Sequence, residues 1–359
     1  MAIPFLKSLF PTKSFLGVDI GTTTIKIVEL KRSQGLPELL NYGLLESYGH
    51  LERINNAIQT STLKLADRET TEFLKILLKY GGFKSREAVA SIPAFASFTA
   101  MMELPLMSEK ETSQAMQFQA KQYIPLPVSS VTIDWIKVDE RLDQKGNAFQ
   151  KILLVSVPNE QIQKYKTIFD GAGLNLTTLE IEGLSSARSI TNRSDKTSLI
   201  VDIGARSTGI SVARNGLLKF SGQTDFAGGS LTQTLATGLN IRARRAEDLK
   251  KQRGLKGIGG EYELSTLMLP ILDVIINEVR RVRDDYERGY TDKIQQVILS
   301  GGGANLLGVG EYFQGELGLP TMKAGPFSQV SYSSEIEPLI SDLSSEFPVA
   351  IGLAMRGFQ

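Results

Sequence analysis

The four-residue sequence Val-Asp-Ile-Gly occurs twice in this chain, at residues 18–21 and 201–204. Each copy ends an apolar run that predicts a buried strand, and each is followed by a turn with hydroxyl side chains and a second β-rich segment. The copies lie 183 residues apart in a chain of 359 residues. The repeat therefore predicts two related half-domains, and the length suits two lobes better than one core.

The segments around the two copies predict similar series of elements. Strands are expected at 15–20, 25–30, 39–45 and 88–92 in the first half, and at 199–203, 208–213, 217–222 and 296–300 in the second. Asn215-Gly216 predicts a hairpin turn. Apolar spacing predicts helices at 67–80, 229–239, 245–253, 263–288, 304–316 and 348–356.

Between the two halves, the pattern indicates an inserted α+β unit of strand, helix, strand, strand, helix, strand. The strands are expected at 98–104, 131–138, 150–157 and 176–181. Ser108 is followed three residues later by Glu111, which predicts a capping box for a helix ending near Tyr123. Asn159 is expected to cap a second helix that ends at Gly171 or Gly173.

Composition excludes several classes of function. The 40 basic and 39 acidic residues nearly cancel, so the chain has no overall charge to attract nucleic acid. Cysteine is absent, which excludes disulfides and thiolate metal sites. The longest apolar stretch, 267–276, contains Pro270 and Asp273 and is too short to span a bilayer. The first residues lack the sustained apolar region of a secretory signal.

Both turns after the repeated sequence have the composition of a phosphate-binding site. A tight glycine turn allows backbone N–H groups to approach an anion, and hydroxyl and basic side chains add further donors. The residues expected to contact phosphate are Gly21, Thr22, Thr23, Thr24 and Lys26 in the first half, and Gly204, Ala205, Arg206, Ser207 and Thr208 in the second. Asp19 and Asp202 would repel phosphate on their own, so we expect them to hold Mg²⁺, mostly through water.

Two further glycine segments lie in the second half. Gly301, Gly302, Gly303 and Asn305 follow a buried strand, where bare backbone allows a base or ribose to lie close. Gly228 and Gly229 precede a helix, and Glu247 and Lys250 lie within one helical turn that is expected to face the ribose. Each segment alone is commonly an ordinary glycine turn, but four in this order indicate a nucleotide site. The sequence has no GxxxxGK[ST] run, and no GxGxxG follows a strand, which excludes the P-loop and Rossmann alternatives.

The superfamily of actin, Hsp70 and sugar kinases has similar phosphate and adenosine motifs, which read here, in order, DIGTTTIK, VDIGARST, GG, AEDLK and SGGGANL. More narrowly, the PilM family of type IV pilus assembly proteins resembles this chain over about residues 15–359, in the segments FLGVDIGTTTIKIVEL, FQAKQYIPLP and AIGLAMRGF. The resemblance implies an α/β, two-lobed, actin-like ATPase fold with duplicated RNase H-like halves and an inserted SHS2-type α+β module. It also implies ATP and Mg²⁺ as cofactors.

The resemblance further implies the domain organisation and the partners. The expected parts are subdomain 1A at 14–95, the inserted subdomain 1C at 96–178, a linking helix at 179–196, subdomains 2A and 2B at 197–330, and a return to subdomain 1A at 331–359. The expected partner is the N-terminal tail of a PilN-like membrane protein, in a pilus or related type II secretion assembly. Contact with pilus assembly ATPases, and a homodimer or polymer, are further expectations. The protein is then cytoplasmic and contacts the inner membrane only through its partners.

Three questions stay open at this stage. The resemblance places Glu182 where superfamily members orient the attacking water, which would make the chain at most a weak ATPase. An equally good explanation of Glu182 is an acidic residue favoured by the dipole at a helix N-terminus. An FtsA-like division filament is one alternative, although such proteins usually continue into an amphipathic membrane helix and this chain stops at Gln359. A small-molecule kinase of the superfamily is the other. For the pilus reading, we expect the tail to bind a groove between the first lobe and the inserted module, near Tyr123.

Overall fold

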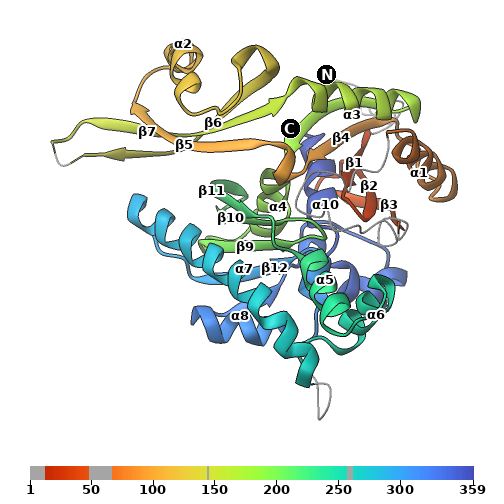
Figure 1. Ribbon diagram of the computed structural model, residues 1–359. Helices are drawn as coiled ribbons and strands as arrows, with labels where there is room; N and C mark the ends of the chain where they lie inside the picture. The colour runs from red at the N-terminus through yellow and green to blue at the C-terminus, as the bar shows by residue number, and fades with distance from the viewer. Residues whose placement is uncertain (1–12, 48–66, 144, 257–261) are drawn as a thin grey trace.

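The computed structural model describes residues 13–47, 67–143, 145–256 and 262–359 (Figure 1). Residues 1–12, which we did not expect to act as a secretory signal, lie outside this part. The described residues form two five-stranded sheets and one three-stranded sheet. Within them, no helix is both long enough and apolar enough to cross a bilayer.

The two large sheets have the same strand order. The first is β3-β2-β1-β4-β8 and the second is β11-β10-β9-β12-β13. In both, the three strands at one edge are antiparallel and the others run parallel to the central strand. Their bounds are β1 Ser14–Ile20, β2 Thr24–Lys31, β3 Glu38–Glu46, β4 Glu87–Ile92, β8 Asn175–Ile181, β9 Ser198–Ile203, β10 Thr208–Arg214, β11 Leu217–Thr224, β12 Gln296–Ser300 and β13 Thr321–Lys323. The duplicated halves predicted from the repeated sequence are confirmed.

Helices cover each sheet and separate the two lobes. The first lobe has α1 (Asp67–Tyr80) and α3 (Asn159–Gly171), whose buried side chains form one core with β1, β2 and β4. The second core combines its sheet with α5 (Gly228–Gly238), α6 (Ala243–Arg253), α7 (Tyr262–Gly289) and α8 (Val309–Leu317). Figure 1 shows α4 (Glu182–Thr191) and α10 (Pro348–Arg356) between the sheets, with the short α9 (Ile340–Leu343) leading to α10.

The inserted module has its own sheet and core. Strands β5 (Phe98–Pro105), β7 (Ala148–Pro158) and β6 (Val131–Leu142) pair antiparallel in that order. Helix α2 (Glu109–Gln119) packs on this sheet through Met116, which is buried with side chains of all three strands. Its N-terminus has the predicted capping box, in which Ser108 accepts from the Glu111 N–H and donates its own N–H to the Glu111 carboxylate.

Three local expectations differ from the structure. Strand β8 pairs with β4 and α3 packs in the first-lobe core, so neither belongs to the module's sheet. Asn159 is wrong as a helix cap: it is the first residue of α3, and its side-chain oxygen accepts from the Thr132 hydroxyl at 2.8 Å. The helix expected at 304–316 begins at Val309, after a 3₁₀ turn at Gly302–Asn305.

The module also contacts the second lobe, which it overhangs in Figure 1. Lys219 on β11 donates to the Val138 carbonyl on β6 at 2.5 Å and lies 3.7 Å from the Asp139 carboxylate. On β7, the Lys151 ammonium lies 3.4 Å from the centroid of the Tyr290 ring. The module therefore bridges the lobes on the side away from β3.

Candidate nucleotide site

The two repeated turns have the same backbone geometry. The Gly21 N–H donates to the Thr24 carbonyl at 2.9 Å, and the Gly204 N–H donates to the Ser207 carbonyl at 3.1 Å. A Cβ atom at either glycine would lie about 3 Å from that carbonyl oxygen, at 3.0 Å and 2.9 Å respectively. Both positions therefore favour glycine, and each turn follows a strand that carries an aspartate one residue before its end.

Lys26 lies within a group of carboxylates. It is the cross-strand neighbour of Asp19, with its Nζ 3.6 Å from the Asp19 carboxylate and 3.8 Å from that of Glu346. Burial opposes the charged form of Lys26, but the negative charges of Asp19, Glu346, Asp202 and Glu182 outweigh it and raise the pKa of Lys26. A single buried cation thus faces four carboxyl groups from both lobes.

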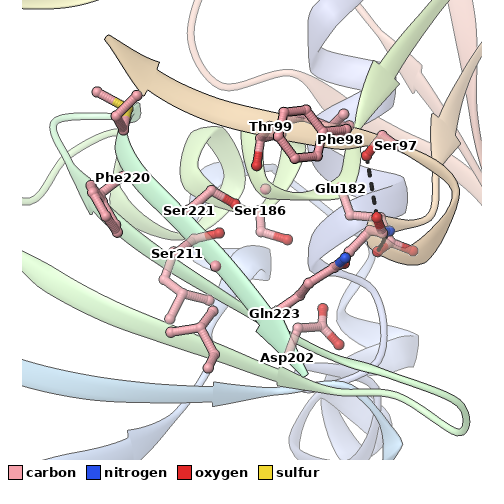
Figure 2. Close-up of a pocket in the computed structure, with 18 of the residues that line it drawn as sticks. Ser97, Phe98, Thr99, Glu182, Ser186, Asp202, Ser211, Phe220, Ser221 and Gln223 are labelled. Atoms are coloured by element: carbon pink, nitrogen blue, oxygen red, sulfur yellow. Dashed lines mark hydrogen bonds between the residues drawn. The ribbon is translucent and has the colours of Figure 1, made fainter. Parts of the chain in front are cut away.

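Glu182 and Asp202 line a cavity of about 370 Å³, which Figure 2 shows with Gln223 beside Asp202. Burial and the charges of Asp19 and Asp202 raise the pKa of Glu182 well above its usual value. Burial is also the main cause that raises the pKa of Asp202 to about 6. Glu182 begins α4 and its carboxylate accepts from the Ala94 N–H at 3.1 Å.

The glycine pair before α5 lies directly on the second turn. The Gly228 N–H donates to the Gly204 carbonyl at 2.9 Å, and the Gly229 N–H donates to the Ala205 carbonyl at 2.8 Å. A Cβ atom at Gly229 would lie 2.5 Å from that Ala205 oxygen, so only glycine allows this approach. Backbone bonds therefore join two of the sequence-predicted segments.

Glu247 and Lys250 lie one helical turn apart on α6 and bond to each other and to α5. The Lys250 ammonium donates to Glu247 at 2.6 Å, to the Thr232 hydroxyl at 2.8 Å and to the Gly228 carbonyl at 2.9 Å. Burial lowers the pKa of Lys250 despite the attraction of Glu247. This network fixes α6 against the start of α5, beside the second turn.

The triple glycine also packs against the second turn. Gly301 has φ +78°, and a Cβ atom there would lie 2.5 Å from Asp202 Oδ1. A Cβ atom at Gly303 would lie 2.3 Å from the Ile203 side chain. Asn305 accepts from Lys323 at 2.9 Å and from the Ser345 hydroxyl at 3.0 Å. These contacts place the loop after β12 at the end of β9.

Thr208 is buried, whereas other residues of the two turns line a groove. Thr208 donates to the Phe226 carbonyl at 2.7 Å. Gly21, Thr22 and Arg206 line a groove of about 350 Å³ between the first lobe and the module. The Arg206 guanidinium lies 4.3 Å from the centroid of the Phe95 ring. Arg206 is thus directed toward the groove, which its sequence context did not indicate.

Three residues next to the site belong to no sequence motif, so sequence analysis did not find them. Glu346 precedes the last helix and lies near Lys26 only in the fold. Phe95 follows β4 in a short apolar segment. Ser91 donates to Asp19 at 2.9 Å; a fully buried serine within the apolar strand β4 is a signal that pattern reasoning can use.

Asp19 and Asp202 have the chemistry of ligands for Mg²⁺. Among the described residues, no group of three or more histidine, aspartate or glutamate side chains forms a ready metal site. Asp19 and Asp202 instead stand one residue before the ends of corresponding strands of the two halves, and burial raises the pKa of Asp202 although the charge of Lys26 opposes this shift. Two such aspartates suit Mg²⁺ that keeps water and takes its other ligands from phosphate.

A sequence model of the family described as type IV pilus assembly protein PilM matches residues 17–358. The chain belongs to the PilM family. A chain in a solved PilM-PilN type IV pilus biogenesis complex is 22% identical with a TM-score of 0.81, and the match covers 97% of this chain and all of that one.

Two more distant structures share the fold with this PilM-family chain. The ethanolamine utilization protein EutJ from Carboxydothermus hydrogenoformans is 19% identical with a TM-score of 0.55, over 96% of this chain and 91% of that one. MreB5 of Spiroplasma citri bound to ADP is 15% identical with a TM-score of 0.53, over 97% and 96%. With the duplicated sheets, these likenesses confirm the two-lobed actin-like ATPase fold.

Proposed function

We propose that this PilM-family protein binds Mg·ATP between its lobes and uses it as a conformational switch in pilus assembly. The observation that carries the proposal is the pair of equivalent glycine turns, with Lys26 facing carboxylates of both halves. Asp19 and Asp202 would hold Mg²⁺, mostly through water, and the metal would neutralise the β- and γ-phosphates. The two turns and the Gly301–303 loop would hold the phosphates and the adenosine, while the Glu247–Lys250 pair would fix α6 at the ribose side.

Calorimetry of ATP binding with Mg²⁺ tests this assignment. We expect Asp19→Ala or Asp202→Ala to weaken Mg·ATP binding severely, because each removes one of the two carboxylates available to the metal. Circular dichroism of each variant checks that the fold is kept. Unchanged affinity in both variants would show that the nucleotide binds elsewhere.

Hydrolysis is proposed to be slow without a partner. Glu182 orients water from the start of α4, but one carboxylate without an arginine finger is a weak catalyst. Its raised pKa also reduces the ionised form that accepts a proton. Glu182→Gln is expected to abolish the remaining turnover and to keep ATP binding, which a phosphate-release assay and calorimetry measure together.

The proposed partner is the cytoplasmic N-terminal tail of a PilN-like inner-membrane protein, bound in the groove between the first lobe and the module. The groove combines apolar side chains of both parts, including Pro93, Phe98, Leu126, Pro158 and Ile168. Leu126 lines the groove and is 45% exposed, and Tyr123, three residues before it in the chain, is 40% exposed. Apolar groups left in contact with solvent at a concave site favour a peptide ligand. Because a short tail loses conformational entropy on binding, we expect an affinity of about 1 μM or weaker.

A pulldown with the tail tests the groove. Leu126→Asp and Tyr123→Asp are expected to abolish binding, because a charge replaces apolar contact area. Leu142→Asp is the matched control, since Leu142 lies at the distal end of β6 with 69% of its surface exposed. Full tail binding by the folded Leu126→Asp variant would contradict the groove assignment.

The proposal places the protein in the cytoplasm, at the inner membrane through this partner. Contact with pilus assembly ATPases and self-association are parts of the same proposal. Sedimentation with and without ATP and anionic liposomes tests the alternative of an FtsA-like filament. Protein that pellets only with ATP and liposomes, and without any PilN-like tail, would favour the filament.

A further inference from the structure

One short segment separates the groove from the cavity at Glu182. Residues 93–98 follow β4 of the first lobe and include Phe98, the first residue of β5 in the module. Ala94, Ser97 and Phe98 line the cavity that contains Glu182 and Asp202. Pro93, Phe95, Ala96, Ser97 and Phe98 line the groove. We call this segment the partition, because a single stretch of chain forms a wall of both cavities.

On the cavity side, the partition holds the carboxylate that we assign to water. The Ala94 N–H donates to Glu182 at 3.1 Å, and Figure 2 shows Ser97 and Glu182 near each other on this wall of the cavity. Ala94 begins a 3₁₀ turn, Ala94–Ala96, and its carbonyl accepts from both the N–H and the hydroxyl of Ser97, at 3.2 Å and 3.3 Å. Phe95 is the middle residue of this closed turn, so a shift of its backbone also reaches the Ala94 N–H.

On the groove side, the partition contacts the second phosphate turn. The Phe95 ring lies 4.3 Å from the Arg206 guanidinium, which is within the range of a cation–π contact. Gly21 and Thr22 of the first phosphate turn line the same groove. A peptide in the groove therefore lies against both turns that would hold phosphate and against the segment that holds Glu182.

We propose that the partition couples the two sites, with Phe95 as the positioning residue between Arg206 and Glu182. This rests on the proposed function: the nucleotide acts on Arg206 and Glu182, and the PilN-like tail acts on Phe95 and Phe98. Each ligand then favours one arrangement of the partition, and the effect is reciprocal because coupling free energies are. The tail therefore changes the affinity for nucleotide by the same factor as the nucleotide changes the affinity for the tail.

The test is a double-mutant cycle on Phe95 and Arg206 in the full chain. Fluorescence anisotropy measures the dissociation constant of a synthetic PilN-like tail, without nucleotide and with saturating Mg·AMPPNP. We expect the two constants of the wild type to differ about fivefold or more. Phe95→Leu keeps an apolar side chain and Arg206→Gln a polar one, and both bring the ratio close to one. The double variant has the ratio of either single variant, because both remove the same contact.

Two further variants separate coupling from damage to the groove. Phe95→Tyr retains the ring and is expected to keep the wild-type ratio. Leu126→Ala removes groove contact area away from the partition, so it weakens the tail equally with and without AMPPNP. As a second readout, the tail changes phosphate release by the wild type and by Phe95→Tyr, and leaves Phe95→Leu unaffected.

The outcomes distinguish this inference from the function on which it rests. A wild type that binds neither AMPPNP nor the tail overturns the proposed function and the coupling with it. A wild type that binds both, with the same ratio as Phe95→Leu, overturns the coupling alone. The coupling is also overturned if the ratio of the two dissociation constants falls to one in both Leu126→Ala and Phe95→Leu. The effect would then belong to the groove as a whole.

Discussion

At the scale of single residues, the proposed nucleotide site groups four carboxyl side chains around Lys26. Lys26 is the buried cation next to Asp19 and Glu346, and the charges of Asp202 and Glu182 also act on it. Glu182 and Asp202 have raised pKa values because burial and like charges oppose ionisation. Sites of this kind lower the stability of the empty protein in exchange for ligand binding.

We expect Asp202→Asn to stabilise the metal-free, nucleotide-free protein at pH 7–8. A folded-state pKa of about 6, against 3.8 for the unfolded chain, means that the ionised carboxylate opposes folding above pH 6. Asp202 keeps part of its surface exposed to the cavity, so we expect a gain of about 1–2 kcal/mol, below the full value of the shift.

The sign of this effect sets its pH dependence. At pH values near 4 the native carboxyl is also protonated, so the difference between wild type and Asp202→Asn is expected to disappear there. Urea unfolding in EDTA at several pH values measures it. A variant that is less stable than the wild type at pH 8 would show that the carboxylate is stabilised in the empty site.

Some of the residues that sequence reasoning found have an environment set by the chain next to them. The turns at Gly21 and Gly204 favour glycine because their own backbone closes on itself, and this signal is local. Glu346 and Phe95 reach the site only through packing between distant segments, so no local pattern indicates them. Asn159 has the right residue type for a cap, but its side-chain oxygen accepts a hydrogen bond from the Thr132 hydroxyl on β6 instead.

At the scale of elements, α10 fits between β1 and α4 with no space for side chains at the contact. A Cβ atom at Gly352 would lie 2.0 Å from the Ser185 carbonyl oxygen of α4. One at Gly17 on β1 would lie 1.9 Å from the Ala350 carbonyl oxygen of α10. Gly352 lies in the C-terminal segment that resembles the PilM family, and its place in the fold explains why glycine is needed there.

Gly352→Ala is expected to destabilise the protein by about 3 kcal/mol or more, because the methyl group meets backbone that cannot rotate away. Gly315→Ala is the matched control. Gly315 is an exposed residue of α8 with nothing within 4 Å of an added Cβ, so the same change should stabilise by about 0.5–1 kcal/mol. Urea unfolding of both variants measures the contrast. Equal stability of the two variants would show that α10 shifts freely between β1 and α4.

Strand periodicity predicted the elements of the insert but not all of their partners. A strand that is half-buried on both faces has the same pattern in a small sheet as at the edge of a large one. Strand β8 therefore read as part of the module, whereas parallel pairing with β4 places it in the first-lobe sheet. The duplication of the two large sheets was predictable because the repeated sequence lies on the central strand of each.

At the scale of the whole molecule, the lobes contact each other on two sides of the cleft. The module bridges to β11 and to Tyr290 at the end of α7. Opposite the module, Lys251 of α6 lies 3.6 Å from Glu46 of β3, as an ion pair between the second and first lobes. An opening of the cleft by rotation about α4 and α10 would separate this pair while the central helices stay packed.

Lys251→Glu is therefore expected to accelerate nucleotide release, because it replaces attraction with repulsion between the lobes. The two side chains are 50% and 34% exposed, and an exposed pair contributes about 0.2–1 kcal/mol, so the rate should rise by about fivefold at most. Stopped-flow release of a fluorescent ATP analogue measures the rate at low and high salt, and the difference between variant and wild type should shrink at high salt.

The charge-swapped double variant Glu46→Lys/Lys251→Glu restores the pair and should return the rate toward the wild-type value. Equal rates in all three proteins at low salt would show that cleft opening does not separate β3 from α6.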